Sequence, residues 1–149
     1  MAKGKQTIYV SGTNPQKIEG KAVAATAPGT IVENVAGGLQ INAAAATVFG
    51  QELLVADIDT SRSRPVTTSW TIAENMVAIK AVSGDFLNVL VATGQTISSR
   101  GTPLSLNGAG LLKIAVTPAT VGATSEQVLA YSDEIITTSG TTLVRVRVA

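Results

Sequence analysis

The sequence SGDFLNVLVATGQTISSRGTPLSLNGAGLLKIAV, residues 83–116, decides the fold of this chain. Within it, the side chains of residues 86–91 divide between two faces with the two-residue period of a β-strand. The run Asn107-Gly108-Ala109-Gly110 predicts a tight turn between two further strands, because Asn and Gly tolerate the positive φ of hairpin turns. Two hairpins and no helical period over this stretch predict an all-β meander or Greek key.

Short strands are expected on both sides of this stretch as well. The last one is the clearest, because Val144, Val146 and Val148 alternate with Arg145 and Arg147, which places the valines inward and the arginines outward. The polar run 57–65 predicts an exposed loop. We therefore expect an all-β, single-domain sandwich or barrel of about eight to ten short strands with little helix. Besides those named above, the expected strands cover residues 7–10, 31–35, 39–42, 53–56, 76–82 and 125–132, and a further extended piece is expected to begin at Thr96-Ile97.

The N-terminal residues 1–27 have weaker signals than the β-domain expected at 28–149. They begin with a polar, basic stretch, continue with the short apolar run 7–10, and then enter the turn-rich segment 11–16. This pattern predicts an extended N-terminal arm, of the kind that lies on a neighbouring molecule and adds a strand to its sheet. An edge strand of the chain's own domain explains the same pattern equally well.

Composition limits the chemistry that this chain of 149 residues, the size of one ordinary domain, can perform. It contains no cysteine and no histidine, which removes disulfides, thiolate metal sites and the commonest general base. Charged residues are 14% of the chain, against about a quarter in typical proteins, and this suits a sheet protein with extensive protein contacts. The net charge is +1 with scattered basic residues, so no nucleic-acid footprint is expected.

Targeting signals are not expected either. No run approaches the roughly eighteen apolar residues of a membrane-spanning helix. The basic start is followed by a turn-rich segment rather than by the apolar core of a signal peptide. We therefore expect synthesis in the host cytoplasm, without membrane contact.

Few residues are candidates for catalysis or metal binding. Lys80 lies inside an apolar run, but a strand position with its ammonium group in water explains it better. Asp57 and Asp59 would share one face of a strand as a weak cation site, yet a solvated loop with Arg62 and Arg64 as neighbours is the preferred interpretation. We expect no catalytic residue, no cofactor, no metal and no enzyme activity.

The order of several short motifs carries a family resemblance. Gly84-Asp85, an apolar strand, Gly94-Gln95, Gly101, Leu104 and the turn 107–110 follow one another at compatible spacing. Residues 28–33, Glu74, Val77 and the closing Arg/Val alternation extend the pattern to both sides. This order resembles the head decoration (cement) proteins of tailed bacteriophages.

The resemblance implies a capsid decoration protein that binds the outer surface of an expanded phage head and stabilises contacts between major capsid subunits. It implies a virion location, the major capsid protein as partner, and a homo-oligomer, with a trimer favoured and a dimer as the alternative. We expect the capsid contacts to come from the arm and from the exposed loop, at Lys3, Lys5, Ile8, Tyr9, Arg62 and Arg64. Two other functions stay open: a virion-surface module that binds glycans or the host, and a cytosolic barrel enzyme.

Overall fold

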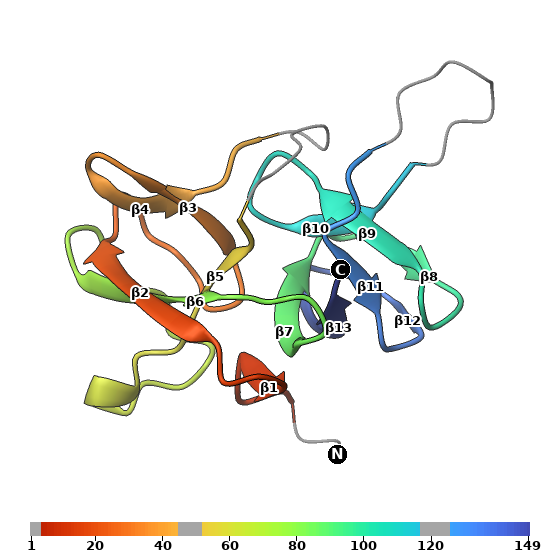
Figure 1. Cartoon of the computed structure of the whole chain (residues 1–149), viewed down its shortest axis with the longest axis horizontal. Helices are drawn as coiled ribbons and strands as arrows, with labels where there is room; N and C mark the ends of the chain where they lie inside the picture. The colour runs from red at the N-terminus through yellow and green to blue at the C-terminus, as the bar shows by residue number, and fades with distance from the viewer. Residues whose placement is uncertain (1–3, 45–51, 117–125) are drawn as a thin grey trace.

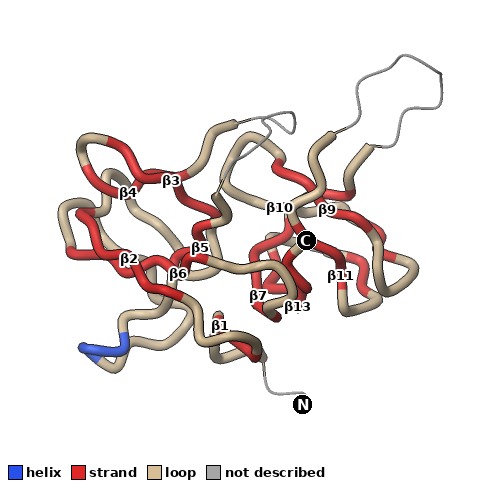
Figure 2. Tube along the Cα trace, viewed as in Figure 1, coloured by secondary structure: helices blue, strands red, loops and turns tan. Residues whose placement is uncertain are grey.

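The computed structural model describes residues 4–44, 52–116 and 126–149, and these residues form two curled sheets side by side (Figures 1 and 2). The first sheet contains β1 (Tyr9–Ser11), β7 (Phe86–Val91), β9 (Pro103–Leu106), β10 (Leu112–Ile114), β11 (Ala130–Ser132) and β13 (Thr142–Val148). The second contains β2 (Gln16–Lys21), β3 (Ile31–Val35), β4 (Gly38–Ile41), β5 (Leu54–Ala56) and β6 (Asn75–Lys80). A small ribbon of β8 (Thr96–Ile97) and β12 (Ile136–Thr137) and one 3-10 turn, η1 (Thr60–Arg62), complete the described elements.

The first sheet closes into a five-stranded barrel. Its strands follow the order β7-β10-β9-β11-β13, and β13 pairs back onto β7 along the full length of β7. β10 runs parallel to β7, whereas the other neighbouring pairs are antiparallel. Alternation places Leu87 and Val89 opposite Val146 and Val144, and all four side chains are fully buried. Closure leaves β7 and β13 paired with each other instead of exposed as free edges.

The second sheet curls in the same way. Its order is β2-β6-β5-β3-β4, and a bridge between Ala22 and Leu39 brings the end of β2 onto β4. The approach is close enough that a Cβ on Gly38 would collide with the Lys21 carbonyl oxygen. A second core fills this barrel, with Leu54, Met76 and the single tryptophan, Trp70, among its buried residues.

The two barrels share one interface. Ile31, Val55 and Ile79 lie on the other face of the second sheet and join the core of the first barrel. Gly29 connects the two sheets through its backbone, because its N–H donates to the Ala56 carbonyl (2.8 Å) and its carbonyl accepts from the Leu90 N–H (2.9 Å). Burial of these large aliphatic side chains stabilises the contact by about 2 kcal/mol for each one.

Most of the strands expected from the sequence are confirmed, and so is the all-β class. The described residues contain thirteen short strands, more than expected, since β2 and β12 did not stand out in the sequence, whereas β8 coincides with the extended piece expected at residues 96–97. Of the two hairpins expected within residues 83–116, only the second one forms. β9 and β10 do form a hairpin, but β7 pairs with β13 and β1, and β8 pairs with β12.

Two structures were expected for the N-terminal region, a projecting arm or an edge strand. Residues 4–27 form edge strands of the chain's own sheets. β1 pairs with β7 in the first sheet, and β2 pairs with β6 in the second. Ile8 is fully buried in the core of the first barrel. The described part of the N-terminal region thus contributes to both barrels.

We expect Gly29→Ala to destabilise the protein more than Gly94→Ala. Both glycines have positive φ, +89° and +77°, and strain at such a position costs about 1–3 kcal/mol for other residues. A Cβ on Gly94 would meet nothing within 4 Å, whereas one on Gly29 would lie 2.5 Å from Leu143 Cδ2. Urea unfolding of both variants measures the difference, and equal losses would contradict the role of Gly29 at the interface.

Candidate interaction surface

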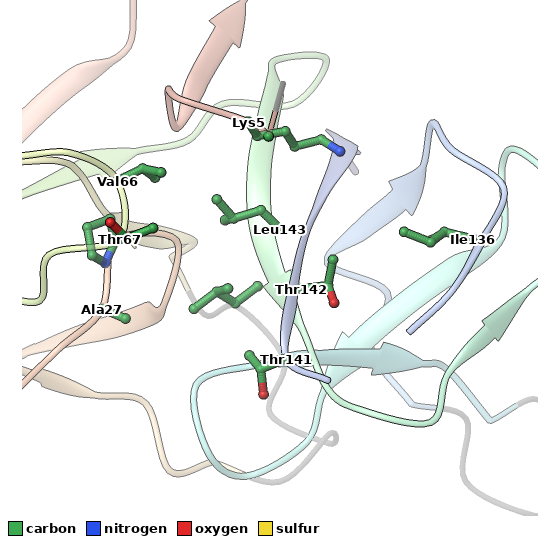
Figure 3. A pocket seen from close by; sticks show the side chains of 11 residues that line it. Lys5, Ala27, Val66, Thr67, Ile136, Thr141, Thr142 and Leu143 are labelled. Carbon is green, nitrogen blue, oxygen red and sulfur yellow. The ribbon is translucent and has the colours of Figure 1, made fainter. Parts of the chain in front are cut away.

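An apolar hollow of about 530 Å³ lies where the two barrels meet. Leu90 and Leu143, which are cross-strand partners on the outer face of the first barrel, line it from one side. Pro28 and Val66 line it from the other side. Figure 3 shows the Leu143 side chain in the middle of the hollow, between Val66 and Thr142.

A second hollow of about 480 Å³ adjoins the first. The two share Gly4, Lys5, Val66 and Thr67 as lining residues, and we call them together the junction groove. Lys5 is held at its rim by an ion pair with Glu134, with 2.7 Å between Nζ and Oε2. The groove therefore brings Lys5 beside Pro65–Thr67, the residues that directly follow the predicted contact Arg64.

Arg62 and Arg64 lie in a network of four charges. The Arg64 guanidinium binds Glu74 with two hydrogen bonds, 3.0 Å to Oε2 and 2.9 Å to Oε1, and Arg62 binds the same carboxylate. Asp59 lies 3.6 Å from the Arg62 guanidinium and 3.7 Å from that of Arg64. The Arg64 hydrogen bonds lower the pKa of Glu74 to about 2, helped by the Thr71 N–H, which donates to Oε2.

The loop that carries this network is less exposed than the sequence predicts. Asp57 and Asp59 are both buried. Asp57 pairs with Lys17 (2.9 Å) from β2, and the Ser61 hydroxyl is the main cause of the lowered pKa of Asp59. Asp57 thus fixes the loop to the second barrel, whereas Asp59 binds Ser61, Arg62 and Arg64 within the loop, and the expectation of a fully solvated loop is wrong for both carboxylates.

The other predicted contacts divide between core and surface. Ile8 is fully buried, so its side chain offers no surface to a partner in this conformation. Tyr9 is half-buried, and its hydroxyl oxygen accepts a hydrogen bond from the Asn14 N–H (3.2 Å). Lys3 lies outside the described residues. Lys80, the lysine inside an apolar run, forms an ion pair with Glu52 at 2.7 Å.

The sequence carries a signal for the groove in the outward positions of β7 and β13. The inward positions of the two central strands are Leu87, Val89 and the valines of β13, so alternation places Leu90 and Leu143 outward. Two large aliphatic side chains on an outward face indicate a further contact. Gly29 lies against Leu90 and Leu143 and accounts for part of that contact. The remaining part is the groove.

Comparison with known proteins assigns this chain to no family. No family model matches the chain, and a search of the curated proteins found no similar protein. In the described part of the chain, no group of three or more Asp and Glu residues is placed to hold a metal ion. None of the helices described there is long and apolar enough to span a membrane.

We expect acid to weaken the Glu74 network. Glu74 titrates near its ordinary pKa of 4.5 when unfolded but at about 2 when folded, so its contribution to stability is complete above pH 4.5 and disappears as the pH falls toward 2. Glu74→Gln should therefore lower the melting temperature at neutral pH and lose that deficit near pH 2. Glu19→Gln, at an exposed carboxylate, is the matched control. A Glu74→Gln deficit that is the same at both pH values would contradict this account.

Proposed function

We propose that this protein is a capsid decoration protein, which binds the outer surface of an expanded phage head and stabilises contacts between major capsid subunits. The proposal rests on the order of motifs along residues 28–149 and, above all, on the junction groove. Its expected form is a homo-oligomer, preferably a trimer, on the outside of the virion.

The groove supports this proposal because its chemistry matches that of a protein interface. Such interfaces have an apolar centre and a polar rim. Here Leu90, Leu143 and Val66 supply the apolar centre, and the Lys5–Glu134 pair lies at the rim. An extended segment of a capsid subunit fits this arrangement, since it presents apolar side chains and leaves the paired charges in water.

Linkage explains how such binding would stabilise a head. A protein that binds the assembled lattice but not free subunits shifts the equilibrium toward the lattice by mass action. An oligomer adds avidity when the spacing of its groove copies matches the lattice. No covalent chemistry is needed for this function.

Glycan binding has less support from the described residues. Sugar sites commonly present aromatic faces, but Trp70 is buried and its indole N–H donates to the Asp57 carbonyl (2.8 Å). The Tyr131 ring lies beneath the Arg147 guanidinium, 5.4 Å from the ring centre. We therefore keep glycan binding as an outcome of the test below.

We expect the purified protein to saturate symmetric sites on expanded, undecorated heads. Val66→Glu places a carboxylate in the groove and should weaken this binding by at least about tenfold, or ~1.4 kcal/mol. Val23→Glu, at an exposed apolar side chain that does not line the groove, is the matched control and should bind like the native protein. Circular dichroism checks that both variants stay folded.

Two results would contradict the proposal. Binding to glycans or host cells but not to heads would favour the alternative function. Equal head binding by the two variants would remove the groove from the interface.

A further inference from the structure

The segment before β2 is bound almost entirely to the first barrel. The Asn88 N–H donates to the Ile8 carbonyl (2.7 Å), and the Asn88 side-chain amide donates to the Thr7 carbonyl (2.7 Å). The Ile8 side chain is fully buried in the first barrel's core. Lys5 adds its ion pair with Glu134, which lies between β11 and β12 of the same part of the molecule. Residues 4–11 are thus a strand segment with its own side-chain anchor.

The same segment is covalently joined to the other barrel. From Gln16 onward the chain forms β2, which pairs with β6 in the second sheet. Only residues 12–15 connect the two parts, and Figure 1 shows this short connection passing from β1 to β2. Residues 4–11 are therefore joined covalently to the second barrel through β2 but pair with the first barrel.

The connection is tight. Gly12 has φ +146° and lies against the Asp85 carboxylate, where a Cβ would collide. Asn14 has φ +55°, a left-handed conformation that asparagine adopts more readily than most residues other than glycine, and it turns the chain sharply. The backbone N–H and hydroxyl of Thr13 both donate to Asp85 Oδ1, at 2.9 and 3.0 Å. Short hinges of this kind favour the exchange of strands between copies.

We propose that β1 is an exchangeable strand, and that residues 4–11 of one copy occupy the edge of β7 in a second copy. Every contact that the segment makes with β7, Glu134 and the core is available on any copy, so exchange between copies loses none of them. The exchange releases the tight connection and links the copies into a closed oligomer. It does not depend on head binding and therefore stands apart from the proposed function.

A second copy of this chain is the partner that we assign to the β7 edge, because its residues 4–11 already match that edge. Ile8 fills the core position, and the Thr7 and Ile8 carbonyls accept both Asn88 donors. A strand from another protein would need an aliphatic side chain and free carbonyls at the same spacing. Binding of such a strand from another protein is a separate outcome of the experiment.

The absence of native cysteine makes a cross-linking test direct. Ser11 and Phe86 are register partners across β1 and β7, so a Ser11→Cys/Phe86→Cys chain can form a disulfide between these strands. With exchange, most of the oxidised protein should migrate as covalent oligomers on a non-reducing gel. Without exchange it should migrate as an internally cross-linked monomer, which would overturn the proposal.

A control pair distinguishes exchange from random collisions. Tyr131 and Arg147 are register partners on β11 and β13 within the first barrel. Tyr131→Cys/Arg147→Cys should give only cross-linked monomers. Covalent oligomers of this control in similar amounts would mean that collisions explain the first result, and the proposal would fail.

A second measurement needs no disulfide. Light scattering on the native full chain should show an oligomer, and Ile8→Asp should reduce it to a monomer because a carboxylate cannot enter the core site. Circular dichroism reports whether that variant keeps its strands, and Ile72→Asp, at a highly exposed side chain, is the control that should stay oligomeric. A monomeric native protein, or an Ile8→Asp variant that stays oligomeric, would overturn the proposal. A native monomer whose Phe86→Cys form is joined to a head subunit by a reagent that links a thiol to a lysine amine would instead assign the site to a capsid strand.

Discussion

The hydrogen bond from the Leu90 N–H to the Gly29 carbonyl is the contact on which the arrangement of the two barrels depends. It lies at the middle of one edge of β7. At the two ends of that edge, the Asn88 N–H donates to Ile8 and the Ala92 N–H donates to Leu112. Three segments that are far apart in sequence thus share a single strand edge, and the other edge is filled by β13. Because buried backbone donors must be satisfied, the position of β7 fixes the N-terminal segment, the second barrel and the closure of the first barrel together.

Local features were predictable from the sequence, and long-range pairings were not. The turn at Asn107–Gly110 and the alternation of β13 are determined by neighbouring residues, so the hairpin and the buried valines were expected correctly. The pairing of β7 with β13 depends on barrel closure, which no short pattern encodes. The N-terminal region illustrates the same limit: an apolar run followed by a turn describes an arm and an edge strand equally well. What decides between them is the edge of β7 opposite β13, where β1 pairs.

The candidate surface was predictable to a similar extent. Lys5, Arg62 and Arg64 were among the expected contacts: Lys5 lines the junction groove, whereas the two arginines do not line it but lie just before Pro65, which does. The burial of Asp57 was missed because its partner, Lys17, is 40 residues away in the sequence. The arginines of the loop bind Glu74 and Asp59 of the same chain, so their first role is to hold the loop in shape. The proposed interface then relies on apolar groove residues more than on free charges, which agrees with the low charge content of the chain.

Native-state hydrogen exchange tests most directly the claim that β7 and Gly29 unite the two barrels. If they do, the amides of Gly29 and Leu90 should exchange only through global unfolding, at the same free energy as Val89 in the first barrel and Val55 in the second. Two separate exchange energies, one for each barrel, with Gly29 and Leu90 exchanging earlier than both, would contradict the claim.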